Sequence, residues 1–202
     1  MIIKVCGMRD ADNIREVESL GIDMMGFIFW LRSSRYVAER PAYLPTKCKR
    51  VGVFVDATAE DIMQHVKAYG LDIIQLHGKE SPEFISQLIN GLSPETKIIK
   101  ALNIATEEDL DSAKRYEGTA DYLLFDTKGK SVGGNGEKFD WSVLKHYHGT
   151  TPYLLSGGIS PEDATLVRTV NSIGIDLNSK FALSPALKDI DKLNKFIKQI
   201  RS

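Results

Sequence analysis

The stretch Pro152-Tyr-Leu-Leu-Ser-Gly-Gly-Ile159 joins a short apolar strand to two glycines and is followed by Ser160-Pro161. Because Gly157 and Gly158 carry no side chain, their backbone N–H groups can approach an anion closely. Serine is a preferred helix N-cap and proline a preferred first helical residue, so the positive end of a helix dipole would point at the same place. The stretch therefore predicts a phosphate-binding turn at the C-terminal end of a strand.

Three other apolar segments also end in polar or reactive residues. They are Ile2-Ile-Lys-Val followed by Cys6-Gly7, Leu71-Asp-Ile-Ile followed by Gln75-Leu-His-Gly78, and Asp121-Tyr-Leu-Leu-Phe followed by Asp126. In a parallel barrel the C-terminal ends of all strands meet on one face, where active sites lie. These segments therefore predict an active site at the top of a barrel.

Short β-branched or aliphatic runs recur eight times, and most are separated by stretches with helical period. They lie at about residues 2–6, 24–29, 51–55, 71–76, 97–101, 121–126, 152–156 and 173–177. Runs without polar alternation are typical of parallel strands buried on both faces. We predict an α/β fold, a single-domain (β/α)8 TIM barrel over residues 1–202. A doubly wound open sheet is the alternative, disfavoured because no G-x-G-x-x-G follows the first strand.

The segments between the strands carry their own signals. Helix starts are predicted at Thr58 with Asp61, Ser81 before Pro82, Thr106 with Asp109, and Ser160 before Pro161. The prolines of Arg40-Pro41-Ala-Tyr-Leu-Pro45 predict a short or irregular helix after the second strand. The glycine-rich segment 127–138 predicts a loop over the site. The last helix is expected to bury a stripe of apolar residues, Leu187, Ile190, Leu193, Phe196, Ile197 and Ile200.

Charge and composition narrow the class of partner. The 26 basic and 27 acidic residues nearly cancel, which argues against nucleic acid and against a membrane surface and favours a small-molecule substrate. Cys6 and Cys48 are too few for a disulfide framework or a cysteine metal set, so no metal is expected. No leader peptide is recognised and no run reaches the roughly 18 apolar residues of a membrane span. We therefore expect a cytoplasmic protein.

Two residues are candidates for acid–base chemistry. Cys6 could act as a base or nucleophile if cations or helix N-termini lower its pKa from about 8.5, and a thiol at a strand end is expected to be partly exposed. The alternative is that Cys6 is a small buried apolar residue. Asp126, at the rim of an apolar core, suits general-acid chemistry, or it could cap the glycine-rich loop that follows.

Three other side chains could bind substrate. Arg35, near Arg32, could fork onto a carboxylate at the barrel mouth, or both arginines could be ordinary surface residues. His77 has no carboxylate close in sequence and could be a loop histidine bonded to backbone. Asp176 could orient a sugar hydroxyl or hold the loop that follows it.

With these residues assembled, the chain resembles the phosphoribosylanthranilate isomerases of tryptophan biosynthesis nearly end to end. The resemblance rests on Lys4-Val-Cys-Gly-Met8, Gly26-Phe-Ile-Phe29, Ser34-Arg35-Tyr36, Val51-Gly-Val-Phe-Val55, Gln75-Leu-His-Gly78, Leu124-Phe-Asp-Thr127, Gly133-Gly-Asn-Gly136, Phe139-Asp-Trp141 and Leu155-Ser-Gly-Gly158.

The resemblance implies a function and a role for each site residue. N-(5′-phosphoribosyl)anthranilate would be rearranged to 1-(o-carboxyphenylamino)-1-deoxyribulose 5-phosphate without cofactor or metal. Cys6 would be the general base and Asp126 the general acid, while Arg35 would hold the anthranilate carboxylate. Phosphate would be bound by Gly133, Gly134, Gly136, Gly157 and Gly158. The remaining substrate-binding assignments are His77, Asp176, Ser179 and Lys180.

The sequence departs from the family pattern in two places. Asp176-Leu-Asn-Ser-Lys-Phe-Ala182 stands where Asp-Val-Ser-Ser-Gly-Val-Glu is usual, so Lys180 replaces a glycine that approaches the phosphate. Trp30-Leu-Arg-Ser-Ser34 stands where a Ser-Pro-Arg segment is usual.

Two alternative functions stay open: another phosphosugar isomerase, or a non-catalytic barrel that binds phosphorylated metabolites. The oligomeric state also stays open between a monomer and a homodimer.

Overall fold

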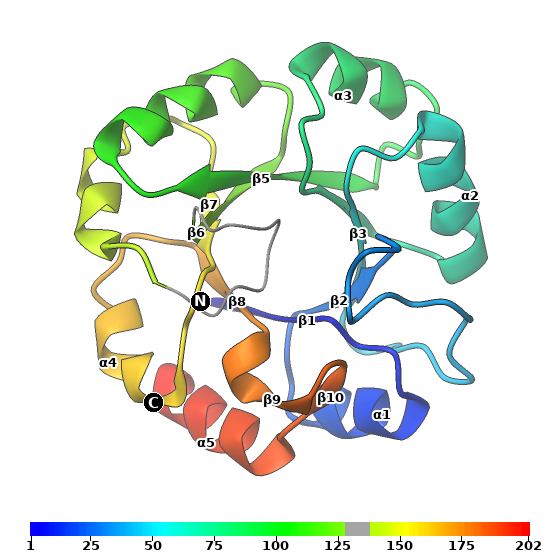
Figure 1. Ribbon diagram of the computed structural model, residues 1–202, viewed down its shortest axis with the longest axis vertical. Helices are drawn as coiled ribbons and strands as arrows, with labels where there is room; N and C mark the ends of the chain where they lie inside the picture. Colours follow the sequence, from blue (N-terminus) through cyan, green and yellow to red (C-terminus); the bar gives the residue numbers. More distant parts are fainter. Residues whose placement is uncertain (128–137) are drawn as a thin grey trace.

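A closed barrel of eight parallel strands forms the centre of the protein (Figure 1). The computed structural model describes residues 1–127 and 138–202. Each strand pairs with the next along the chain, and β8 pairs with β1, for example Asp176 beside Lys4. The predicted barrel is confirmed. The strands are β1 (Ile2–Cys6), β2 (Met24–Ile28), β3 (Lys49–Phe54), β4 (Ile73–Leu76), β5 (Lys97–Ile104), β6 (Tyr122–Thr127), β7 (Tyr153–Leu155) and β8 (Gly174–Leu177).

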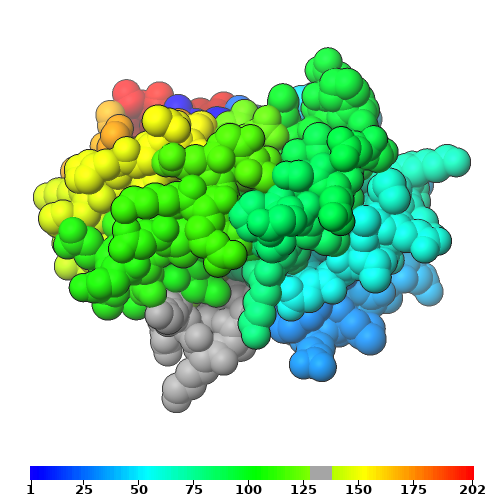
Figure 2. Space-filling model, turned by 90° about the horizontal axis from the view of Figure 1, so that it is seen from above, coloured from blue at the N-terminus to red at the C-terminus, as the bar shows by residue number. Residues whose placement is uncertain are grey.

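Helices surround the barrel and cover its outer face (Figure 1). They are α1 (Ala11–Ser19), α2 (Ala59–Tyr69), α3 (Pro82–Ile89), the 3-10 helices η1 (Glu107–Tyr116), η2 (Trp141–His146) and η3 (Pro161–Asp163), α4 (Ala164–Val167) and α5 (Ile190–Arg201). In the view turned by 90°, successive segments lie next to one another across the face shown, from cyan through green to yellow (Figure 2). The ring closes where α5 lies between α4 and α1 (Figure 1).

The predicted helix starts are confirmed by their capping hydrogen bonds. The Thr58 side chain accepts a bond from the backbone N–H of Asp61 at 3.2 Å. Ser81 caps α3 by accepting from the N–H of Phe84 at 3.3 Å. At the start of η1, the Asp109 carboxylate accepts a hydrogen bond from the backbone N–H of Thr106. At the start of η3, the Asp163 carboxylate accepts one from the backbone N–H of Ser160. These helices therefore begin where a side chain replaces the missing intrahelical acceptor.

Two segments show how proline and strand pairing shape the outer layer. No helix forms between β2 and β3, which agrees with the irregularity predicted from Pro41 and Pro45. The last helix begins at Ile190 rather than Leu187, so that part of the prediction was wrong. Leu187 instead belongs to β10 (Leu187–Lys188), which pairs with β9 (Ala182–Ser184) after the 3-10 turn η4 (Ser179–Phe181).

Apolar side chains fill the inside of the barrel and the layer between strands and helices. Strand alternation sends every second residue inward. The interior cluster consists of Cys6, Met24, Ile28, Val51, Val53, Ile73, Ile99, Ala101, Leu124 and Leu154. By the same alternation Lys4, Gln75 and Asp126 share the faces of Cys6, Ile73 and Leu124. Charged and polar side chains are therefore built into the upper interior of the barrel. No helix among the described residues is long and apolar enough to cross a bilayer.

Candidate active site

Cys6 is the last residue of β1 and faces the barrel interior. Its side chain packs with the interior cluster, and the residue is only 3% exposed. The expectation of a partly exposed thiol was therefore wrong, because strand alternation turns this side chain inward. Gly26 on the neighbouring strand β2 lies in register with Cys6, and its missing side chain leaves space for the thiol, since a Cβ there would lie 2.7 Å from the Cys6 sulfur.

The groups around Cys6 shift the pKa of its thiol in opposite directions. Burial raises the pKa of the thiol above its ordinary value, and the Asp176 carboxylate acts in the same direction. The ammonium groups of Lys4 and Lys188 act to lower this pKa. Lys4 is fully buried and forms an ion pair with Asp176, with 2.8 Å between Nζ and Oδ1. Although burial alone would lower the pKa of Lys4, the neighbouring Asp176 and Cys6 raise it.

Asp126 lies on β6 and is in contact with the end of β4. Its Oδ2 is 3.3 Å from Nε2 of His77, and its Oδ1 accepts a hydrogen bond from the Thr127 N–H. The Gln75 side chain lies 3.1 Å from the other ring nitrogen of His77. The Nε2 atom of His77 is buried and lies close to Asp126 without forming a hydrogen bond to a described residue. The sequence did not reveal this contact, because the carboxylate comes from a strand far along the chain.

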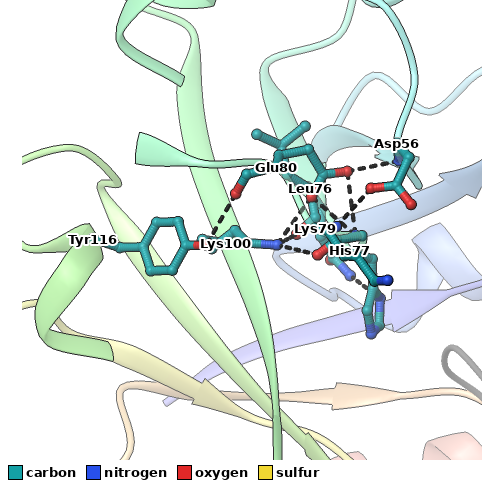
Figure 3. Close-up of polar contacts among 9 residues, drawn as sticks. Asp56, Leu76, His77, Lys79, Glu80, Lys100 and Tyr116 are labelled. Carbon is teal, nitrogen blue, oxygen red and sulfur yellow. Dashed lines mark hydrogen bonds and ion pairs between the residues drawn. The ribbon is translucent and has the colours of Figure 1, made fainter. Parts of the chain in front are cut away.

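A buried ion pair holds the segment that carries His77 (Figure 3). Lys100 Nζ lies 2.9 Å from Glu80 Oε2 and also donates to the carbonyls of Leu76 and Gly78. Glu80 accepts from the N–H groups of Asp56 and Gly78 as well. These contacts tie the loop after β4 to β3 and β5 and fix the direction in which His77 leaves β4. Lys100 and Glu80 were missed, although a lysine within the apolar run of β5 was a usable signal.

Arg35 lies in the loop after β2 and is half-buried. Its Nε is buried and has no hydrogen-bond partner among the described residues. The stem packs against the end of β1, where a Cβ on Gly7 would lie 2.6 Å from Arg35 Cδ. Arg35 therefore stands next to Cys6 with an unused donor, while Arg32 is exposed.

The turn after β7 has the backbone shape that the glycines predict. Gly157 and Gly158 have φ values of 84° and 67°, in the left-handed region that favours glycine. A Cβ on Gly157 would lie 2.2 Å from Thr127 Oγ1, so β7 and β6 approach closely there. The predicted phosphate residues Gly133, Gly134 and Gly136 lie outside the described residues.

A surface pocket beside this turn is rich in lysine. Lys138, Lys180 and Lys192 line it together with Gly158 and the segment Ser160–Glu162. Lys180 is exposed, on the turn η4 that begins at Ser179. The predicted residues Gly158 and Lys180 are thus brought to one pocket. Within residues 1–127 and 138–202, no group of three or more His, Cys, Asp or Glu side chains is arranged to hold a metal ion.

These features define a (β/α)8 barrel with a thiol, a carboxyl and a glycine turn at the C-terminal ends of its strands. Comparison with known proteins gives the family. Residues 3–199 match the family described as N-(5′-phosphoribosyl)anthranilate (PRA) isomerase. The chain belongs to this family.

Individual relatives agree along the whole chain. An N-(5′-phosphoribosyl)anthranilate isomerase of Parabacteroides distasonis is 51% identical over 210 residues, which cover 99% of this chain and 93% of the relative. The crystal structure of the isomerase from Thermus thermophilus has a TM-score of 0.85 at 26% identity, covering 100% of this chain and 98% of that one. A second solved isomerase, in complex with reduced 1-(o-carboxyphenylamino)-1-deoxyribulose 5-phosphate, has a TM-score of 0.82 at 28% identity. It covers 100% of this chain and 99% of that one.

Proposed function

We propose that this protein isomerises N-(5′-phosphoribosyl)anthranilate to 1-(o-carboxyphenylamino)-1-deoxyribulose 5-phosphate, with Cys6 as general base and Asp126 as general acid. The proposal follows the family and the ligand of its solved relative. The observation that carries it is a thiol and a carboxyl on two strands of one barrel, both buried and both near its C-terminal face.

The chemistry divides into one protonation and one deprotonation. Asp126 donates a proton to the ribose ring oxygen, and the bond between this oxygen and C1′ breaks to give an iminium. The Cys6 thiolate then takes the proton from C2′, which forms an enolamine that tautomerises to the ketone. Substrate and product have the same atoms and the same number of electrons. This mechanism therefore requires no external oxidant or reductant.

Other groups would position the substrate. Arg35 presents an unused Nε beside Cys6 and suits the anthranilate carboxylate, since guanidinium and carboxylate pair in a fork geometry. The backbone at Gly157 and Gly158 suits the phosphate, and Lys180 adds a positive charge to the neighbouring pocket. His77 contacts Asp126 and would orient the acid. Asp176 would act through Lys4 rather than on a sugar hydroxyl, because its Oδ1 is engaged in the ion pair.

The direct test is turnover. Phosphoribosylanthranilate is generated in the assay mixture, and the loss of its anthranilate fluorescence is followed after the protein is added. We expect Cys6→Ser to lower kcat by on the order of 10²-fold or more, the usual contribution of a general base. Cys48→Ser is the matched control, because Cys48 precedes β3 at the opposite end of the barrel. Normal turnover by Cys6→Ser would remove Cys6 from the mechanism. A wild-type protein that binds a product analogue without turnover would instead be a non-catalytic barrel.

A further inference from the structure

Lys188 is a buried lysine to which neither the sequence analysis nor the mechanism above assigns a role. It lies on β10 and is only 1% exposed. Its backbone N–H donates to Oδ1 of Asn13 at 2.7 Å, and its carbonyl accepts from Nδ2 of Asn13 at 3.1 Å. Both backbone groups of Lys188 are thus bound by one α1 side chain. This arrangement fixes the position from which its side chain enters the barrel mouth.

The ammonium of Lys188 has only neutral hydrogen-bond partners in the part of the chain that the structure describes. It donates to the backbone carbonyl of Asn178 at 3.2 Å and to Asn178 Oδ1 at 2.8 Å. Lys4 differs, because its charge is matched by Asp176 at 2.8 Å. A buried cation without a countercharge is costly unless an anion forms next to it. The Lys188 ammonium therefore stabilises a negative charge that forms next to it.

The group in reach that can become negative is Cys6. The Asn178 oxygen bound to Lys188 lies 3.0 Å from the Cβ position of Gly7, the residue after Cys6. The charged or titratable groups around the Lys188 ammonium are Cys6 and Lys4 on β1, Asp176 on β8 and Arg35 after β2. Lys4 and Lys188 both act to lower the pKa of Cys6, Lys4 more strongly, while Asp176 acts to raise it. The Lys4 ammonium is paired with Asp176, whereas the Lys188 ammonium has no carboxylate partner among the described residues.

We propose that Lys188 is a positioning residue whose buried ammonium is a countercharge for the Cys6 thiolate, in addition to Lys4. This inference rests on the proposed role of Cys6 as the base. The proton balance is simple: the Cys6 S–H bond releases its proton to solvent, the sulfur keeps the electron pair, and Lys188 keeps its own proton.

The titration of the two groups is coupled, which shapes the test. Burial lowers the pKa of Lys188 to about 8, although Cys6 acts to raise it, and burial raises the pKa of Cys6. A thiolate and an ammonium stabilise each other, so the relevant step is the one in which sulfur loses its proton while Lys188 stays charged, and thiolate absorbance reports that step. Without the lysine, only the thiol with its raised pKa remains. Its deprotonation should then require a higher pH.

The experiment measures the Cys6 thiolate directly and needs no turnover. Thiolate formation is followed by ultraviolet absorbance against pH in unliganded Cys48→Ser protein, with the Cys6→Ser, Cys48→Ser protein subtracted. We expect Lys188→Met to raise the midpoint by about one pH unit or more, a tenfold smaller thiolate fraction at neutral pH. Lys188→Arg, which keeps the charge, should retain most of the thiolate. Lys195→Met, which removes an exposed charge from α5, is the control and should change nothing.

Two results would overturn the proposal. One is a folded Lys188→Met protein with an unchanged thiolate midpoint, and the other is an equal shift in Lys188→Arg. If Lys188→Met does not fold, the reciprocal measurement decides. The 13C resonance of the Lys188 side chain should titrate at a lower pH in Cys6→Ala than in wild type, because coupling is mutual. An unchanged titration would refute the pairing. If Cys6→Ser still turns over, the proposed catalytic role fails, but these midpoints still report on the pair.

Discussion

Replacing Lys100 by methionine is expected to lower the free energy of unfolding by about 3 kcal/mol. Lys100 and Glu80 have side chains only 1% and 3% exposed, and their ion pair is 2.9 Å long. The substitution keeps an unbranched side chain of similar length but removes three hydrogen bonds, to Glu80 and to the carbonyls of Leu76 and Gly78. Breaking a buried pair from one side typically costs about 3–5 kcal/mol, because the remaining charge stays buried.

The lower end of that range applies because Glu80 keeps other donors. The N–H groups of Asp56 and Gly78 still bond its carboxylate at 2.9 Å. For a chain of this size, about 3 kcal/mol corresponds to a fall in Tm of roughly 6–12 °C. Urea and thermal unfolding, followed by circular dichroism, measure both quantities.

The same strand offers a matched control. Lys97 also forms an ion pair on β5, with Asp121 at 3.2 Å, but its side chain is 46% exposed. Lys97→Met should therefore cost less than about 1 kcal/mol. If Lys100→Met and Lys97→Met have the same stability, the buried pair does not hold the loop after β4, and the reasoning is refuted.

Three further predictions concern the site itself. Asp126→Asn should lower kcat by on the order of 10²-fold in the fluorescence assay, because an amide cannot protonate the ring oxygen; near-normal kcat would require another acid. Lys180→Ala should raise KM about tenfold and reduce its salt dependence with little change in kcat, as expected for a charged contact that holds ground and transition states alike. An unchanged KM would mean that Lys180 points to solvent. Gly157→Ala should destabilise the protein by about 1–3 kcal/mol in urea unfolding, since its φ is 84° and the new Cβ would meet Thr127. Wild-type stability would show that the turn can relax.

Features that depend on neighbours in the chain could be predicted from the sequence. The eight strands were located because each is a continuous apolar run, and buried parallel strands need such runs. Helix starts such as Thr58 and Ser81 were located because an N-cap bonds a residue three positions away. The turn at Gly157 was also predicted from the local sequence, because its left-handed backbone conformation favours glycine over other residues.

The assembly of the site needed the tertiary structure. The contact of His77 with Asp126 joins two strands that are distant in the chain, and the pair of Lys4 with Asp176 joins the first strand to the last. No local pattern encodes such distances. Burial of Cys6 was also misjudged, because exposure at a strand end depends on what the opposite strands place around it.

The sequence alone therefore determined the barrel, the helix starts and the residue types at the strand ends, because these follow from periodicity and local hydrogen bonding. Only the tertiary structure decided which charges meet inside the barrel. Lys188 illustrates the difference: in the sequence it lies outside the apolar stripe of the predicted last helix, where a solvent-facing lysine is expected. In the structure, β10 pairs with β9, and Asn13 binds the backbone of Lys188. As a result the Lys188 side chain points toward the barrel mouth, near Cys6. Electrostatic interactions depend on distance in space, and closing the barrel sets that distance.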